Sequence, residues 1–291
     1  MSEILKIQNL SKSFGKNRIL QDFSVSLEKG RVYGLLGKNG EGKTTLIRMI
    51  MGVIPPDSGE IFFKGKKITF RDADYKKEIG YIPEESFFYV WMRIVDVLDF
   101  NASFYPAWNA KKASEYLERF SLDRKSRVGK LSRGMKLKLG LVVALAAKPE
   151  LLILDDPTSG IDVPTRQDFL KNIIRELSDA GTTILFSTHL VHELERIIER
   201  LGILHHGHLI LDENYEKVKN RAKRIRLTFG NTAPAELDIP GILTAKKENE
   251  RWESVIYPWN EEIEAKIRSI SGTRLEIEPL SLEEIFMSFV S

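Results

Sequence analysis

The stretch "VYGLLGKNGEGKT", residues 32 to 44, decides the fold because it runs from an apolar segment into a glycine-rich loop. The first six residues are continuously apolar or small, as in a parallel strand that is covered on both faces. Residues Gly37 to Thr44 have the spacing G-x-x-x-x-G-K-[ST], and a helical pattern follows them. Strand, glycine loop and helix in this order predict a P-loop NTPase core.

The chemistry of this loop follows from its residue types. Glycines let backbone N–H groups turn inward around phosphate oxygens at the N-terminus of a helix. Lys43 is expected to meet the β and γ phosphates, and the Thr44 hydroxyl is expected to meet Mg²⁺. The candidate nucleotide-binding residues of the loop are Gly37, Asn39, Gly40, Gly42, Lys43, Thr44 and Thr45.

A second segment, "LLILDDPTSGID" at 151 to 162, ends a buried strand with two adjacent carboxylates. A phosphate loop that uses Mg²⁺ needs an acidic residue at the C-terminal end of a neighbouring strand, and Asp155 has that place. Asp156 lies one step farther out, where a carboxylate can orient a water for attack on the γ-phosphate. The alternative is that Asp156 is a helix N-cap before Pro157.

The order of strand and helix patterns predicts the fold class. Continuously apolar strands alternate with helical patterns, as in an α/β protein with a mostly parallel sheet. Residues 87 to 149 contain three helical patterns and are expected to form an inserted helical subdomain, with Ser132 as an N-cap. We expect an α/β domain over 1 to 215 and a small α+β domain over 216 to 291.

Composition excludes several classes of protein. The 291 residues are 42% hydrophobic and 29% charged, as in an ordinary globular protein. No cysteine is present, which excludes disulfides and thiolate metal sites, and a net charge of +3 gives no support to nucleic-acid binding. The longest apolar run, at 139 to 147, is far shorter than the roughly 20 residues of a membrane span. These features favour a cytoplasmic chain without a nucleic-acid partner.

Two further motifs, "LSRGM" at 131 to 135 and "STHLVHELE" at 187 to 195, complete a pattern that resembles the ATP-binding subunit of an ABC transporter. The resemblance covers about residues 1 to 215. It implies a head-to-tail dimer with ATP sandwiched between the subunits. Ser132 and Gly134 would close over the γ-phosphate held by the other subunit.

The same resemblance implies roles for three other residues. Asp162 would be the polar end of a loop that crosses the dimer interface, and His189 would contact the γ-phosphate and the attacking water. Phe14 lies where the family places an aromatic ring that stacks on adenine, although an isolated phenylalanine is more often a core residue.

Four residues depart from the usual pattern of the family. Asp156 stands in place of the common glutamate base, and Glu84 in place of a glutamine, while Arg133 and Met135 occupy positions usually held by glycine and glutamine. Glu84 is still a hard oxygen donor for Mg²⁺ and a candidate catalytic residue. These departures are compatible with ATP binding and leave the rate of hydrolysis open.

The predicted function is that of an ATP-hydrolysing subunit that drives a separate transmembrane permease. The residues "LSRGMK" and the C-terminal "SLEEIF" look most like exporter systems. The chain would act as a homodimer or heterodimer, peripherally attached to the inner face of the membrane. The alternatives are an ABC-class ATPase acting in repair, on ribosomes or in assembly, and a regulatory nucleotide-binding subunit with little hydrolysis.

Two other stretches carry expectations. The three histidines of "LHHGH" at 204 to 208 could indicate a metal site, but the flanking apolar runs favour a hairpin with Gly207 in the turn. The aromatic stretch "SFFYVWMRI" at 86 to 94 is expected to help form a docking groove for the membrane subunit, extending from Glu84 to Phe104. The alternative is that this stretch is core of the helical subdomain.

Overall fold

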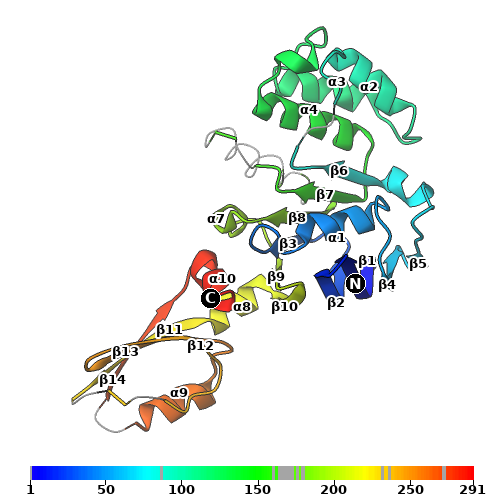
Figure 1. Cartoon of the computed structure of the whole chain (residues 1–291). Coiled ribbons are helices and arrows are strands. Elements are labelled where there is room, and N and C mark those ends of the chain that lie inside the picture. Colours follow the sequence, from blue (N-terminus) through cyan, green and yellow to red (C-terminus); the bar gives the residue numbers. More distant parts are fainter. Residues whose placement is uncertain are drawn as a thin grey trace.

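The computed structural model shows a large β-rich part, a helical segment and a smaller β-rich part (Figure 1). It describes residues 2–85, 88–158, 161–162, 174, 177, 181–230, 233–234, 237–270 and 273–291, with only the backbone of 192–193. The pattern "TRQDFLKNIIRELSDAG" at 165 to 181, which predicts a helix ending at Gly181, lies largely outside the described residues.

A six-stranded sheet forms the centre of the nucleotide-binding part, in the order β10-β9-β3-β8-β7-β6. Every residue of β3, β7 and β8 is buried, as the continuously apolar patterns predict. All neighbouring pairs are parallel except β9 and β10. This confirms the α/β, P-loop-type prediction with a mostly parallel sheet. The strands are β3 (Val32–Leu36), β6 (Ile79–Ile82), β7 (Leu151–Asp155), β8 (Thr183–Thr188), β9 (Arg200–His205) and β10 (His208–Asn214).

An antiparallel sheet, which the sequence analysis did not predict, lies beside this core. Its strands β1 (Glu3–Phe14), β2 (Asn17–Glu28), β4 (Ser58–Phe63) and β5 (Lys66–Lys67) pair in the order β2-β1-β4-β5. Its buried side chains share one core cluster with α1 (Lys43–Ile50), the helix that follows the phosphate loop. The antiparallel sheet thus fixes α1 from the side opposite the main sheet. A short 3₁₀ turn, η1 (Asp74–Glu78), leads into β6.

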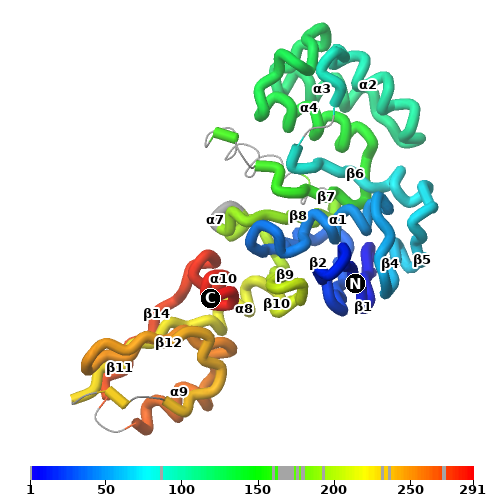
Figure 2. The backbone as a smooth tube through the Cα atoms, viewed as in Figure 1, coloured from blue at the N-terminus to red at the C-terminus, as the bar shows by residue number. Residues whose placement is uncertain are grey.

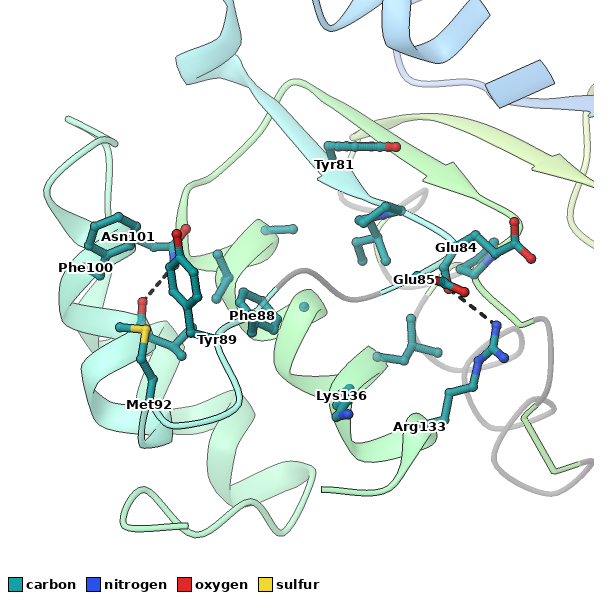
Figure 3. Close-up of a pocket in the computed structure, with 18 of the residues that line it drawn as sticks. Tyr81, Glu84, Glu85, Phe88, Tyr89, Met92, Phe100, Asn101, Arg133 and Lys136 are labelled. Atoms are coloured by element: carbon teal, nitrogen blue, oxygen red, sulfur yellow. Dashed lines mark hydrogen bonds between the residues drawn. The ribbon is translucent and has the colours of Figure 1, made fainter. Parts of the chain in front are cut away.

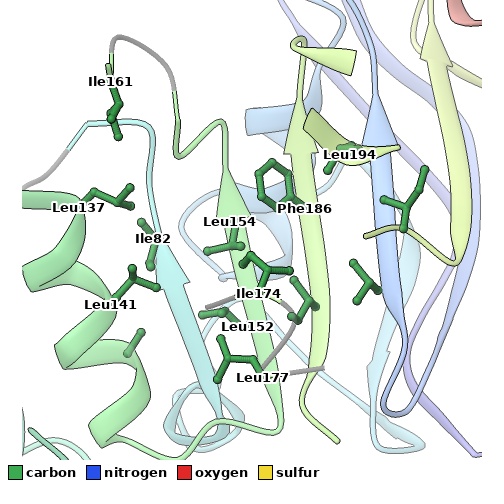
Figure 4. Packing of buried hydrophobic residues seen from close by; sticks show 14 of the residues in the cluster. Ile82, Leu137, Leu141, Leu152, Leu154, Ile161, Ile174, Leu177, Phe186 and Leu194 are labelled. Carbon is green, nitrogen blue, oxygen red and sulfur yellow. The ribbon is translucent and has the colours of Figure 1, made fainter. Parts of the chain in front are cut away.

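The helical segment contains the three predicted helices. They are α2 (Ile94–Ala102), α3 (Ala110–Arg119) and α4 (Arg133–Ala146), with a 3₁₀ turn η2 (Val128–Lys130) before α4. The Ser132 hydroxyl accepts a hydrogen bond from the Met135 amide, which confirms Ser132 as the N-cap of α4. Leu137 and Leu141 of α4 pack near Ile82 and Leu154 of the main sheet (Figure 4). The boundaries of the subdomain stay a prediction.

A second antiparallel sheet occupies the C-terminal part, at the end of the molecule farthest from α2 and α3 (Figure 2). Its order is β12-β13-β11-β14, and its own core includes Trp252 and the buried face of α9. The sequence predicts a turn at Glu248 to Glu250, and the hairpin between β12 and β13 turns at 249 to 250, where Asn249 has a φ of 49°. The elements are β11 (Lys223–Phe229), β12 (Ile242–Glu248), β13 (Arg251–Ile256), α9 (Glu261–Arg268) and β14 (Thr273–Pro279).

The last helix does not belong to that C-terminal core. Leu282, Ile285 and Phe286 of α10 (Leu282–Phe289) are buried in the large cluster of the nucleotide-binding part, and α10 contacts α7 (Val191–Leu194). The helix α8 (Tyr215–Arg221) is buried in the same cluster. The chain therefore returns to the core around the main sheet after completing the C-terminal sheet, and the division between 215 and 216 stays a prediction.

Candidate nucleotide-binding site

The phosphate loop depends on glycine at two positions. Gly42 has a φ of 106°, in the left-handed region that side chains rarely adopt. A Cβ atom on Gly37 would lie 2.9 Å from the backbone oxygen of Leu204, too close for contact. The sequence thus permits a tight backbone turn between β3 and α1, with the N-terminus of α1 at the end of the loop. Asn39 is exposed at this turn, and Thr45 lies in the first turn of α1.

Lys43 is buried in the loop, with only 7% of its surface exposed. Its Nζ donates to the carbonyl oxygens of Gly37 at 2.6 Å and Lys38 at 3.1 Å. Burial lowers the pKa of Lys43. The negative charges of Asp156 and Asp155 raise it in part, and those of Glu41 and Glu84 add smaller effects in the same direction. The ammonium group is thus held inside the loop and in the field of the two carboxylates.

Asp155, the carboxylate predicted to hold Mg²⁺, is the last residue of β7. It is 2% exposed, and it accepts a hydrogen bond from the Ser187 hydroxyl at 2.8 Å. Burial raises the pKa of Asp155, while the hydrogen bonds from Ser187 and Thr44 oppose that rise. The structure therefore brings together the hydroxyl and the carboxylate that sequence analysis assigned to Mg²⁺.

Asp156 contacts His189, an interaction that sequence analysis did not predict. Asp156 Oδ2 pairs with His189 Nδ1, and Asp156 Oδ1 accepts from the Thr188 hydroxyl at 3.2 Å. An ionised carboxylate only accepts, so the proton of this pair lies on Nδ1 of the imidazole when Asp156 is charged. The two candidate catalytic side chains are thus one hydrogen-bonded unit.

The backbone of Asp156 argues against the helix-cap alternative. Asp156 has a φ of 46°, whereas an N-cap residue has extended backbone angles. Its amide donates to the Ser187 carbonyl at 2.8 Å, which fixes this left-handed turn directly after β7. The side chain is 8% exposed and faces residues at the end of β8. The turn aims the carboxylate across the ends of the strands.

The remaining predicted residues lie at the edges of the site. Glu84 follows β6, and its carbonyl oxygen lies 3.5 Å from the Arg133 guanidinium (Figure 3). Phe14 is 51% exposed at the end of β1, with Lys12 Nζ 5.5 Å from its ring centroid. Ser132 is exposed and Gly134 half-buried at the start of α4, and Asp162 is exposed beyond β7. No distance places these residues within the buried cluster around Lys43, so their roles stay predictions.

Several neighbours of the site were missed by sequence analysis. Ser187 and Thr188 end β8, and the parallel register pairs Asp155 with Ser187 across the sheet. Polar residues at the end of an apolar strand were the available signal. No local pattern indicated that Lys38 Nζ donates to the carbonyl of Val290 at 2.9 Å, because this contact joins the loop to the C-terminal helix.

The part of the chain that the structure describes has no helix long and apolar enough to cross a membrane.

Comparison with known proteins identifies the family. Residues 20–159 match the family described as "ABC transporter". The chain is 33% identical to the ABC transporter ATP-binding protein YtrB of Bacillus subtilis, over 98% of this chain and 97% of that protein. It is 35% identical to the bacitracin transport ATP-binding protein BcrA of Bacillus licheniformis, over 77% of this chain and 74% of that protein.

Solved structures agree with the sequence relatives. The ATP-binding subunit of an ABC transporter superposes with a TM-score of 0.69 and 28% identity, covering 75% of this chain and 92% of that one. The ADP conformation of MJ1267, an ATP-binding cassette of an ABC transporter, gives a TM-score of 0.64, also at 28% identity. The match covers 76% of this chain and 95% of that one. The phosphate loop, the buried carboxylates and these relatives together show that the chain belongs to the ATP-binding proteins of ABC transporters.

Proposed function

We propose that this ATPase subunit of an ABC transporter hydrolyses ATP in a head-to-tail dimer and drives export through its transmembrane permease. The observation that carries the proposal is the group formed by the buried Lys43, Asp155 and Asp156 with the half-buried Thr44 and His189. It joins a cation for phosphate, two oxygen donors for a metal ion, and a carboxylate with an imidazole partner. These are the groups that phosphoryl transfer to water requires.

The site fits Mg²⁺. Thr44 and Asp155 offer hard oxygen donors, and Thr44 is close enough to Asp155 to lower the pKa of that carboxyl. The pKa of Asp155 is raised by burial, so a nearby cation would stabilise its charged form. Glu84 is a further candidate donor from the end of β6. A bound Mg²⁺ would neutralise charge on the β and γ phosphates.

Asp156 is the proposed acceptor of the proton from the attacking water. Its carboxylate is fixed from two sides by Thr188 and His189, which limits it to one orientation. His189 is 32% exposed at its side chain, so the imidazole lies between the buried carboxylate and solvent. This arrangement supports a role of His189 in orienting Asp156 and in contacting the γ-phosphate.

The dimer is proposed because the residues expected to cover the phosphates lie on a different segment from the loop. Ser132 and Gly134 begin α4, which packs against α3 and β6. A helix N-terminus with an exposed Ser132 is suited to an anion supplied by another subunit. Phe14 is exposed, as a ring that stacks on adenine requires.

ATP is expected to assemble this dimer. A non-hydrolysable ATP analogue with Mg²⁺ should double the mass that light scattering measures, because the nucleotide completes the interface. ADP is the matched control and should leave the mass of the apo protein unchanged. The absence of a nucleotide-dependent mass change, both for this chain alone and with its permease, would count against the sandwich.

A groove between the helical segment and the main sheet is the proposed docking site for the permease. It has a volume of about 720 Å³ and is lined by Glu84, Phe88, Tyr89 and Phe100, among others (Figure 3). Trp91 is 67% exposed beside the groove, and its ring stacks on Tyr89 with centroids 5.6 Å apart. Ser86 and Phe87 of the predicted stretch lie outside the described residues. Exposed aromatic rings beside Glu84 fit a partner-binding surface better than a core.

Trp91→Asp is expected to detach the chain from its permease while preserving ATP binding. The substitution places a charge where an apolar partner surface would pack, and Trp91 is too exposed to support the core. Copurification of the native complex from membranes measures the effect. Phe70→Asp, which alters another exposed aromatic residue away from the groove, is the matched control. Full assembly of the Trp91→Asp complex would remove the support for docking here.

The direction of transport is proposed from the relatives. Besides the bacitracin transport protein, the chain is 37% identical over 212 residues to a linearmycin resistance ATP-binding protein of Bacillus subtilis. Resistance and antibiotic transport are consistent with export. In this role the chain would act peripherally at the inner face of the membrane.

A further inference from the structure

We propose that Glu41, His205 and His206 form a binding site for a divalent transition metal ion that joins the phosphate loop to the β9–β10 turn. Among the described residues, these three side chains each offer a ligand atom, and the three atoms lie within 4.8 Å of one another. The site is separate from the carboxylates proposed to hold Mg²⁺. The inference does not depend on the proposed function.

The geometry is close to that of a bound ion. Glu41 Oε1 lies 3.1 Å from His205 Nδ1. Two ligands of a tetrahedral ion with bonds of about 2.0 to 2.1 Å lie about 3.3 Å apart. The rings of His205 and His206 are 3.9 Å apart at their centroids, so the second imidazole approaches the same point. Small rotations of the His205 and His206 rings would bring both imidazoles and Glu41 to bonding distance of one ion.

The backbone holds these residues in place without an ion. His206 and Gly207 have φ values of 48° and 77°, as in the two-residue turn of a tight hairpin. The Gln21 amide donates to the Gly207 carbonyl at 2.9 Å, which ties the turn to β2. The His206 amide donates to Glu41 Oε2, so the carboxylate is oriented by a hydrogen bond of the kind that supports metal ligands.

The chemistry of the ligands selects the class of ion. Imidazole nitrogen with one carboxylate suits Zn²⁺, Co²⁺ or Ni²⁺, whereas Mg²⁺ and Ca²⁺ prefer oxygen. The side chains of Glu41 and His205 are only 11% and 19% exposed, which favours a charge-neutralising ion over a solvated pair. In the bound form the proton of the neutral His205 ring would lie on Nε2, leaving Nδ1 free to coordinate.

Such an ion would act as a clamp on the loop. Glu41 lies between Gly40 and Gly42, which both have left-handed backbone angles. The ion would connect this glycine-rich stretch of backbone to the end of β9, beside β3 in the main sheet. We therefore expect metal binding to raise the thermal stability of the nucleotide-binding part.

The test is a Co²⁺ titration of the untagged, full-length protein in excess Mg²⁺, followed by visible absorption and by the melting temperature. One equivalent of Co²⁺ should bind and raise the melting temperature, and Zn²⁺ should displace it. His206→Asn retains a residue that tolerates the left-handed backbone, and it should weaken binding at least about tenfold. Glu41→Gln keeps an acceptor for the His206 amide but loses the charge, and it should weaken binding similarly.

Two control variants separate this site from others. His208→Ala removes a histidine of the same hairpin outside the cluster, and His189→Ala removes the one at the proposed hydrolysis site. Both should retain the Co²⁺ spectrum. No stoichiometric binding to the wild-type chain, or equal binding by the wild type, His206→Asn and Glu41→Gln, would overturn the proposal.

Discussion

Asp156→Asn is expected to abolish ATP turnover while ATP remains bound. The amide can still accept from Thr188, so the local shape is kept, but it cannot take a proton from water. General-base catalysis contributes about 10²- to 10⁴-fold, and the fall in kcat should lie in that range. Steady-state ATPase assays with the membrane partner present, together with equilibrium ATP binding, measure the two effects. The variant should also accumulate the ATP-bound dimer.

The variant His189→Ala is the matched comparison for Asp156→Asn. Because Asp156 and His189 contact each other, the losses caused by Asp156→Asn and His189→Ala should not add in the double variant. Independent roles would instead give losses that multiply. Full ATPase activity of Asp156→Asn would place the base elsewhere and make the second carboxylate a structural residue.

Lys43→Ala is expected to weaken ATP binding at least about tenfold. A hydrogen bond to a charged group contributes about 1.5 to 3 kcal/mol, and Lys43 is the buried ammonium group of the loop. Its Nζ donates to the carbonyls of Gly37 and Lys38, inside the loop that is expected to hold phosphate. Titration calorimetry with ATP and Mg²⁺ measures the change.

Lys38→Ala is the control for the loss of one positive charge from the same loop. Lys38 is exposed and donates to the Val290 carbonyl, so its removal should affect the contact with α10 more than the affinity for ATP. Equal affinities of the wild type and Lys43→Ala would refute the assignment of the loop.

Much of the fold follows from local sequence. The strands β3, β7 and β8 were predicted because strands that are covered on both faces are built mainly from apolar residues. The cap at Ser132 and the hairpin at Gly207 were predicted because capping and tight turns need particular side chains or glycine. The N-terminal antiparallel sheet was not predicted, since its half-buried strands mix polar and apolar residues irregularly.

The sequence by itself determined the phosphate loop and the residues of the family motifs, because these depend on residue type and short spacing. Only the tertiary structure decided which of them touch. Asp156 contacts His189, which lies 33 residues away in the chain, and Glu41 contacts His205, which lies 164 residues away. The return of α10 to the ATPase core was likewise fixed by packing of apolar side chains remote in sequence. Such contacts depend on strand order and register, which no local pattern encodes.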